Sequence, residues 1–253
     1  MSAKEPRPSL GAGVWIHRAT HVARVFARYG FGSAMERLGL GAYVPRRLRP
    51  SGEDLTPAER LRHALQELGP VGVKLGQVLA CRPDLLPPEY LTELRKLEDE
   101  VGSFPFEQAK EVIEEEMGSK LEDLFDDFEE EPRAAASLAQ VHRAKLKTGQ
   151  VVAVKVQRPD AAQTVEMDLQ LLVAAARIAE RYSRPMREAR VAEFALEFAH
   201  IMRNELNYYI EAHRTDRLRE ALADYEEAKV PLVYWNYTTR RVLTMEWCGG
   251  ARP

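Results

Sequence analysis

The amino-acid sequence predicts an α+β protein in which helices precede and interrupt a small antiparallel sheet. Apolar residues recur with a helical period through most of the first 120 residues. Two pairs of short β-branched runs follow, each joined by a short polar turn, as in β-hairpins. Helices and strands do not alternate one by one, which argues against the parallel sheet of an α/β fold. The content of 45% hydrophobic and 30% charged residues is that of an ordinary globular protein.

The first 50 residues form a basic segment on an otherwise acidic chain. They hold nine lysines and arginines against two glutamates, or +7, so the remainder carries −10 within the net charge of −3. Residues 14–29 have the pattern of an amphipathic helix, whose apolar side contains Trp15, Ala19, Val22, Phe26 and Tyr29. The other side carries His17, Arg18, His21, Arg24 and Arg28. A membrane surface, a nucleic acid, packing against a core and a solvated basic face all stay open for this helix.

A linker over 44–56 and a series of helices come next. Thr56 before Pro57 predicts a helix start. We expect helices over 57–68, 71–81, 87–100 and 106–117. In the second of them, Val71, Leu75, Val78 and Leu79 share one face, and Lys74, Gln77 and Cys81 share another. Gly76 costs this helix about 1 kcal/mol relative to alanine, which predicts that another group approaches closely there.

The second half of the chain predicts the sheet. Strands over 139–146 and 150–157 are joined by a turn at Thr148 and Gly149. Helices over 160–182 and 187–222 follow, and then strands over 230–235 and 240–247. The acidic residues within 126–131 predict a solvated turn and no metal site.

Lys155 is the clearest candidate for a functional residue. In its strand a period of two places it on one face with Ala153, while the flanking valines point to the other. A lysine in such a strand needs an anionic partner, either a carboxylate or a phosphate. The run V-A-V-K matches the V-A-I-K of protein kinases, whose lysine contacts nucleotide phosphates and a helix glutamate. Residues 134–141 fit the kinase frame G-x-G-x-x-G-x-V with alanine at all three glycine positions and Val141 at its end.

The partner carboxylate is expected on the helix predicted over 187–222. An apolar stripe on that helix contains Phe194, Phe198, Ile201 and Tyr209. Glu205 falls on the stripe, and Glu211 is a second candidate on a different face. A solvated surface charge is the alternative for each glutamate.

Taken together, these residues resemble the UbiB/AarF family of atypical protein-kinase-like proteins, which is linked with ubiquinone and other isoprenoid-quinone biosynthesis. The resemblance extends from about residue 30 to the last residue. It matches Lys74, Gly76 and Gln77 to the family's K-x-G-Q motif, in a helical extension that folds over the nucleotide pocket. Glu205 and Asn207 occupy the family's E-x-D position, with asparagine where aspartate is usual.

The resemblance also implies a nucleotide site and a division of the chain. Residues 242–248 resemble the last strand and the hinge of a kinase N-lobe, with Met245 as gatekeeper. The nucleotide-binding residues implied are Ala134, Ala135, Ala136, Ser137, Val141, Ala153, Lys155, Glu211, Met245, Glu246 and Cys248. The implied parts are a basic amphipathic segment over 1–50, a K-x-G-Q extension over 51–120 and a kinase-like N-lobe over 121–253. The C-lobe with the catalytic and metal-binding residues is missing, so we expect no catalysis by this chain alone.

In a full-length protein the resemblance implies binding of ATP with Mg²⁺, followed by hydrolysis or phosphoryl transfer to a small molecule in support of ubiquinone biosynthesis. Lys74 and Gln77 would exclude protein substrates. The alternative is a non-catalytic regulatory module with a vestigial nucleotide site, whose partner is a membrane surface or a quinone-precursor lipid. The basic segment and Asn207 favour this alternative.

The remaining sequence features limit the redox state, the location and the partners that we expect for this protein. Cys81 and Cys248 follow no metal or redox spacing, so we expect reduced thiols. No run of about 18 apolar residues occurs, and no motif for nucleic-acid recognition is found. We therefore expect a cytoplasmic protein, at most peripheral to a membrane, without a nucleic-acid partner.

Overall fold

The structure, a computed structural model, describes residues 12–33, 55–97, 102–225 and 227–249. The chain divides into two compact units. The helical unit joins Met1–Glu98 to Glu166–Phe198, and the sheet unit joins Asp99–Val165 to Ala199–Pro253. Most of the linker predicted over 44–56 lies outside the described residues.

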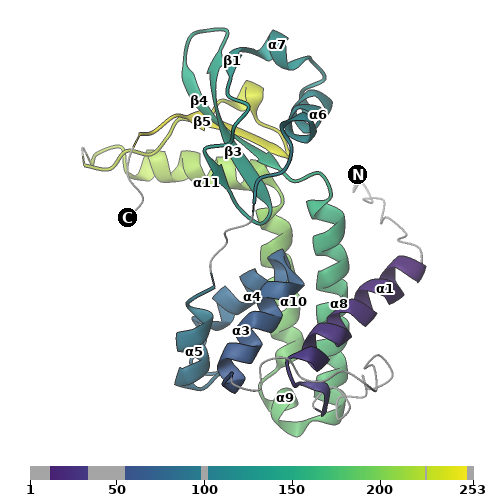
Figure 1. Cartoon of the computed structure of the whole chain (residues 1–253). Helices are drawn as coiled ribbons and strands as arrows, with labels where there is room; N and C mark the ends of the chain where they lie inside the picture. Colours follow the sequence, from purple (N-terminus) through teal and green to yellow (C-terminus); the bar gives the residue numbers. More distant parts are fainter. Residues whose placement is uncertain (1–11, 34–54, 98–101, 226, 250–253) are drawn as a thin grey trace, which may run out of the picture. The chain divides into compact units, whose positions relative to one another are not determined.

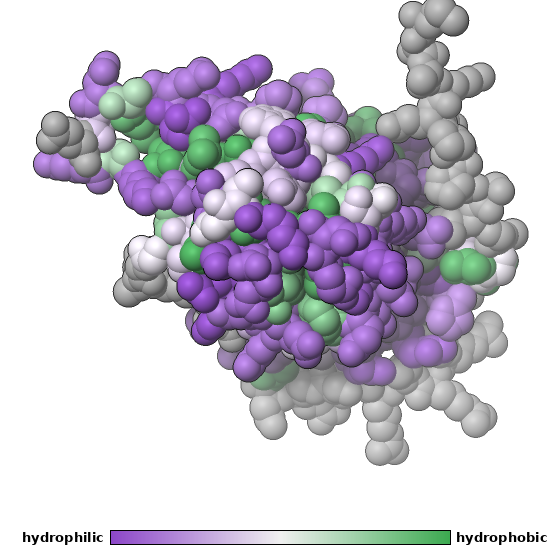
Figure 2. All heavy atoms as spheres, turned by 90° about the horizontal axis from the view of Figure 1, so that it is seen from above, coloured by the Kyte–Doolittle hydropathy of each residue, from purple (hydrophilic) through white to green (hydrophobic). Residues whose placement is uncertain are grey.

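On the face drawn in Figure 2 the surface is mostly hydrophilic, with hydrophobic residues in small separate patches.

Three helices of the helical unit pack around a core made mostly of leucine. They are α3 (Pro57–Leu68), α4 (Pro70–Leu79) and α5 (Pro88–Leu94) (Figure 1). Their core contains Leu65, Val73, Ala80, Leu94 and Leu97. The helices predicted over 57–68 and 71–81 are confirmed within two residues, whereas the helix predicted over 87–100 is shorter and ends at Leu94.

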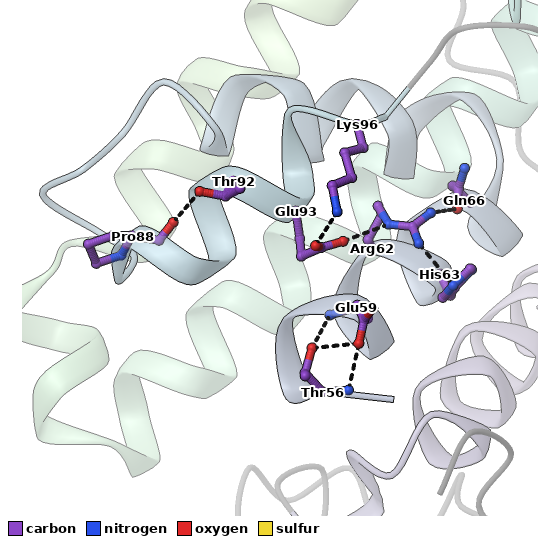
Figure 3. A network of polar contacts seen from close by, with 9 residues as sticks. All are labelled: Thr56, Glu59, Arg62, His63, Gln66, Pro88, Thr92, Glu93 and Lys96. Carbon is purple, nitrogen blue, oxygen red and sulfur yellow. Dashed lines mark hydrogen bonds and ion pairs between the residues drawn. The ribbon is translucent and has the colours of Figure 1, made fainter. Parts of the chain in front are cut away.

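Helix α3 begins where the sequence predicts, with Thr56 as the N-cap and Pro57 as the first helical residue. The Thr56 hydroxyl accepts the Glu59 N–H at 3.3 Å, and the Glu59 carboxylate accepts the Thr56 N–H at 2.8 Å (Figure 3). This reciprocal capping box satisfies two backbone donors at the helix start. On the same helix Arg62 donates to Glu93 of α5 at 3.2 Å, and Lys96 pairs with the same carboxylate (Figure 3).

Helix α1 (Ala12–Arg28) packs within the helical unit through its arginines as well as its apolar residues. Arg18 donates to both carboxylate oxygens of Asp168 at 2.6 and 2.7 Å, and to the Leu68 carbonyl at 2.8 Å. Arg28 donates to Glu67 at 2.5 Å. The basic side of this helix, for which the sequence left several partners open, is therefore partly engaged in ion pairs, because Asp168 is buried and requires a counterion.

The long helix predicted over 187–222 is wrong, because the chain breaks twice. After α8 (Ala161–Tyr182) come the short α9 (Arg184–Glu188), α10 (Val191–Glu205) and α11 (Tyr208–Ala221). Arg190 has φ 52°, a left-handed conformation that interrupts a helix. Asn207 has extended φ −116° and ψ 97°, which ends one helix and starts the next. The predicted apolar stripe is wrong in part: Phe198 is buried, whereas Ile201 in the same helix and Tyr209 beyond the second break are exposed.

The sheet unit holds an antiparallel sheet with the order β1-β3-β4-β5, and β2 pairs with β3. The strands are β1 (Phe125–Phe128), β2 (Ala134–Ala135), β3 (Ala139–Leu146), β4 (Val151–Gln157) and β5 (Val242–Glu246). The hairpin predicted over 139–146 and 150–157 is thus confirmed. Part of the predicted acidic turn is instead β1, because Phe125 and Phe128 flank two exposed aspartates and pack inward.

Helices cover both faces of this sheet. On one face Val152, Val154 and Val156 are fully buried against α6 (Phe106–Met117), and the short α7 (Leu121–Leu124) extends this core. On the other face α11 packs Tyr208 and Ala212 against Ala139 and Leu243. The strand predicted over 230–235 is wrong, since only Val233 bridges to Met245 before the 3-10 turn η2 (Trp235–Tyr237) begins.

A chain of buried hydrogen bonds ties β3 to the segments beside it. The Gln140 side-chain oxygen accepts the Phe104 N–H at 3.1 Å, so its amide nitrogen donates to Nε2 of His142 at 2.9 Å. His142 Nδ1 then donates to the Glu129 carbonyl at 2.8 Å. This order requires a neutral imidazole, and burial lowers the pKa of His142 below 6.5.

We predict that the stability of the sheet unit falls below pH 6.5 because of His142. The unfolded chain takes up a proton near pH 6.5 while the folded chain does not, so stability is fully present above that pH. The free energy of unfolding should decrease by up to about 1.4 kcal/mol per pH unit on acidification. Chemical denaturation between pH 5 and 8 measures this slope, with His142→Gln as the test and His200→Gln, an exposed site, as the control. A slope unchanged in His142→Gln would contradict the prediction.

Candidate functional site

Lys155 of β4 and Glu211 of α11 form an ion pair on the face of the sheet that α11 covers. The ammonium nitrogen lies 2.8 Å from both carboxylate oxygens. The lysine and glutamate side chains are 28% and 39% exposed. Of the two glutamates that the sequence offered, the structure therefore pairs Glu211 with the lysine. Glu205 lies at the last position of α10 and is half-buried.

Tyr208 forms the floor below this pair and was missed in the sequence. The lysine nitrogen lies 4.8 Å from the centre of its ring, within the range of a cation–π contact. Burial, and then the charges of Glu211 and Glu205, raise the pKa of Tyr208 so that the phenol stays neutral. The sequence predicted a continuous helix here, and Tyr208 became recognisable only once the structure showed that α11 begins at this residue.

Three features of the chain place Glu211 near Lys155. Asn207 caps α11 by accepting the Tyr209 N–H on its side-chain oxygen at 3.2 Å. The Tyr208 N–H donates to the Arg240 carbonyl at 3.0 Å, next to β5. The buried Gln157 amide at the end of β4 donates to the Leu206 carbonyl at 3.0 Å. The break between α10 and α11 is thus bonded on both sides, and Glu211 follows in the first turn of the new helix.

The role of Asn207 in this arrangement does not require a charge. Asparagine and aspartate are nearly equivalent as helix N-caps, because each presents an acceptor oxygen to the free N–H groups. The asparagine at the E-x-D position therefore retains the start of α11, and with it the position of Glu211.

The alanine-rich stretch forms a tight β turn beside the pair. Ala134 and Ala135 are strand β2, paired with Val141 and Gln140 of β3. The Ala136 N–H donates to the Ala139 carbonyl at 2.8 Å, and Ser137 is buried within the turn. Val141 lies directly opposite Lys155 in the β3–β4 register.

The same sheet face continues from Lys155 toward the end of β5. Ala153 pairs with Arg143 on one side and with Met245 on the other, which makes a row of three residues beside the row of Val141 and Lys155. The Arg143 guanidinium lies over the Trp247 ring at 5.9 Å, a contact with no sequence signal.

The side chains of two residues that the resemblance placed at a nucleotide, Glu246 and Cys248, have other surroundings in the structure, and their role at a nucleotide stays a prediction. The Glu246 side chain pairs with Lys229 at 2.7 Å, and this hydrogen bond holds the pKa of Glu246 below its usual range. Cys248 is exposed just past β5, and its thiol is free, as is that of Cys81.

The K-x-G-Q residues lie on α4 of the helical unit, where two of them contact the core. A methyl group on Gly76 would lie 2.1 Å from Leu97 Cδ1 and 3.1 Å from Leu65 Cδ1. Gln77 donates to the Leu97 carbonyl at 3.2 Å, and Lys74 is half-buried. The close approach predicted at Gly76 is therefore confirmed, while the role of Lys74 and Gln77 at a nucleotide stays a prediction.

The described part of the chain contains neither a cluster of metal-binding side chains nor a membrane-spanning helix. There, no three His, Cys, Asp or Glu side chains gather in a way that could hold a metal ion. No helix within those residues is long and apolar enough to cross a bilayer.

Comparisons with known proteins agree on one family. A profile of the ABC1 atypical kinase-like domain matches residues 96–253. The chain is 39% identical over 240 residues to the probable protein kinase UbiB of Pseudomonas aeruginosa, covering 91% of this chain and 45% of that protein. It is 43% identical over 196 residues to the chloroplastic protein ACTIVITY OF BC1 COMPLEX KINASE 3 of Arabidopsis thaliana, covering 77% and 27%.

One solved structure is also similar. The complex of Rv3197 with erythromycin from Mycobacterium tuberculosis matches with a TM-score of 0.53 and 28% identity, covering 76% of this chain and 48% of that one. The chain thus spans less than half the length of each of these proteins.

The N-cap role of Asn207 predicts opposite results for two substitutions. Asn207→Ala should lower the free energy of unfolding by about 1 kcal/mol, because a helix-start N–H loses its acceptor. The free energy of unfolding of Asn207→Asp should stay within about 0.3 kcal/mol of the parent value, since aspartate caps a helix as well as asparagine does. Urea denaturation measures both. An aspartate variant as unstable as the alanine variant would show that the residue acts in some other way.

The close packing around Gly76 predicts that one added methyl group will overpack the core of the helical unit. Gly76→Ala should destabilise the helical unit by about 1–3 kcal/mol, since Leu97 and Leu65 must move. Gly13→Ala in α1 is the matched control, because nothing lies within 4 Å of the added methyl group. It should raise stability by about 0.5–1 kcal/mol through helix propensity. Thermal unfolding that moves in the same direction for both variants would refute the predicted overpacking.

Proposed function

This chain belongs to the family of ABC1 atypical kinase-like domains, and on that premise we propose that it supplies the N-terminal half of a nucleotide-binding site. The observation that carries the proposal is the Lys155–Glu211 pair on the sheet. A half-exposed ion pair adds little to stability, with a typical value of about 0–1 kcal/mol. An ammonium group held in place yet open to solvent is, in contrast, suited to binding a phosphate.

The carboxylate and the aromatic ring orient the lysine for this purpose. Glu211 contacts the ammonium with both oxygens, and Tyr208 supports it from below. The ammonium has three donors, so a phosphate oxygen can be bound while the glutamate stays in contact. Phosphate binding of this kind depends on charge and position, which the two side chains provide together.

The neighbouring row of the sheet suits the base of a nucleotide. Ala153 is the smallest side chain on that face of β4, and Val141 and Met245 lie on the adjoining strands. Ala153 pairs across the sheet with Arg143 and Met245, and Val141 lies diagonally from it, so the small side chain leaves room for a flat ring against the strand. The turn at Ala136 lies at the end of β3 that is nearer Lys155, where it can cover phosphates.

We propose ATP or ADP as the ligand, with Mg²⁺ supplied to the phosphates in the longer protein. ATP hydrolysis or phosphoryl transfer in support of isoprenoid-quinone biosynthesis is the activity proposed for the longer protein. Its relatives include the probable protein kinase UbiB and ACTIVITY OF BC1 COMPLEX KINASE 3.

Nucleotide binding by this chain tests the proposal. Isothermal titration with Mg·ADP and Mg·ATP should give saturable binding. Lys155→Ala should weaken it at least about tenfold through the loss of a charged hydrogen bond. Glu211→Gln should weaken it less, because the lysine keeps its charge but loses its orienting carboxylate. Lys145→Ala is the matched control, since that lysine also lies on the sheet but in an exposed pair with Asp126.

Circular dichroism establishes that each variant is folded. Binding by Lys155→Ala equal to that of the parent protein, or equal losses in Lys145→Ala, would overturn the proposed site.

A further inference from the structure

Arg158 directly follows β4 and lies beside the alanine-rich turn of residues 134–138, which we name the alanine turn. Its backbone N–H donates to the Leu138 carbonyl at 2.9 Å. The Nε atom of its side chain donates to the Ala136 carbonyl at 3.4 Å. One residue thus holds two carbonyls of the same turn, one through its backbone and one through its side chain.

Two further contacts keep the Arg158 guanidinium in place. Its Nη2 donates to the Gly102 carbonyl, and its carbon atom lies 5.2 Å from the centre of the Phe104 ring. Phe104 is buried, and its N–H donates to the Gln140 side chain at 3.1 Å. Gln140 in turn pairs with Ala135 in the β2–β3 register. The ring that supports the arginine and the turn that the arginine holds are therefore both bonded to β3.

The guanidinium is partly desolvated and contacts neutral groups. Burial lowers the pKa of Arg158 below its usual value, because desolvation disfavours the charged form. Within the described residues, its partners are the two carbonyl oxygens and the ring, and no carboxylate pairs with it. Since its donors form a rigid planar fork, the guanidinium fixes the direction of a peptide whose carbonyl it holds.

The peptide between Ala136 and Ser137 is oriented in this way. In a planar trans peptide the C=O and N–H groups point in opposite directions. Because the Ala136 carbonyl faces Arg158, the Ser137 N–H points away from the arginine. Ser137 is 5% exposed, and among the residues that the structure describes its N–H has no hydrogen-bond acceptor. A buried N–H without an acceptor is costly, which favours a ligand that supplies one.

We propose that Arg158 is a positioning residue for nucleotide phosphates, because it holds the Ala136–Ser137 peptide with its N–H directed to a phosphate oxygen. This role rests on the nucleotide site proposed above. The alanine turn lies at the end of β3 that is nearer Lys155, so the Ser137 N–H and the lysine ammonium can bind different oxygens of one di- or triphosphate. Binding of a nucleoside without phosphates should not depend on Arg158.

Comparison of ADP with adenosine separates this role from a general effect on the fold. Isothermal titration of the full chain should give a Kd for Mg·ADP that rises about tenfold in Arg158→Met, through the loss of one hydrogen bond to a charged group. The Kd for adenosine should stay unchanged. Arg158→Lys should raise the Kd for Mg·ADP by less, because an ammonium keeps the charge but lacks the planar fork. An equal rise for ADP and adenosine would overturn the proposal, since a purely structural role affects both.

Arg133→Met is the matched control for the loss of a cation near the alanine turn. Arg133 directly precedes the turn, but its side chain is 55% exposed and pairs with Glu129 at 2.5 Å. This variant should bind Mg·ADP like the parent protein. A tenfold loss here as well would show that general charge near the turn, and not the contact with Ala136, attracts the phosphates.

The backbone amide signal of Ser137 reports on the proposed contact itself. In isotope-labelled protein, Mg·ADP should shift this NMR signal and slow its exchange with solvent, whereas adenosine should do neither. In Arg158→Met at saturating Mg·ADP the slowed exchange should be lost. A Ser137 amide that does not respond to bound Mg·ADP in the parent protein would overturn the proposal.

Lys155→Ala distinguishes a failure of this role from a failure of the nucleotide site. Binding of Mg·ADP that is lost in Lys155→Ala but unchanged in Arg158→Met would leave the nucleotide site standing and overturn only the role of Arg158. Absence of binding by the parent protein would overturn both. Circular dichroism establishes that each variant is folded. If Arg158→Met does not fold, Arg158→Lys takes its place, and its affinity should fall for Mg·ADP and not for adenosine.

Discussion

Lys155 lies on a strand of valines and needs a negatively charged partner, and the position of α11 against the sheet depends on that partner. Lys155 lies on the face of β4 opposite to its three fully buried valines. Glu211 supplies the charge with two contacts of 2.8 Å. Since the glutamate side chain is short, α11 must pass close to the sheet, and Tyr208 and Ala212 pack against it as a result.

The position of α11 depends in turn on a helix break that is bonded on both sides. Gln157 holds the Leu206 carbonyl, Tyr208 bonds to the Arg240 carbonyl, and Asn207 caps the new helix. Each bond satisfies a backbone group that a continuous helix would have satisfied by itself. The ion pair, the helix break and the sheet thus depend on one another, which explains why polar residues are buried beside the site.

The main ion pairs of the two units differ in how far they are buried. In the helical unit, buried Asp168 binds Arg18 with both oxygens and ties α1 to α8. In the sheet unit, the Lys155 pair keeps contact with solvent. A buried pair contributes to a particular packing, because breaking it leaves an unpaired charge in the interior. A half-exposed pair can exchange a partner, which is why the Lys155 pair carries the proposed nucleotide site and the Asp168 pair does not.

The sequence alone determined the elements whose signals are local. The capping box at Thr56, the close approach at Gly76 and the hairpin around Gly149 follow from residues a few positions apart. The face of Lys155 and its kinase-like context were equally readable. Periodicity left Glu205 and Glu211 both open as partners of Lys155, and only the family resemblance implied Glu211. The tertiary structure decided what depends on distant partners: the contact of Glu211 with Lys155 across 56 residues, the breaks at Arg190 and Asn207, and the engagement of Arg18. Periodicity reports which face of an element is apolar, but the partner of a charged group is set by the fold.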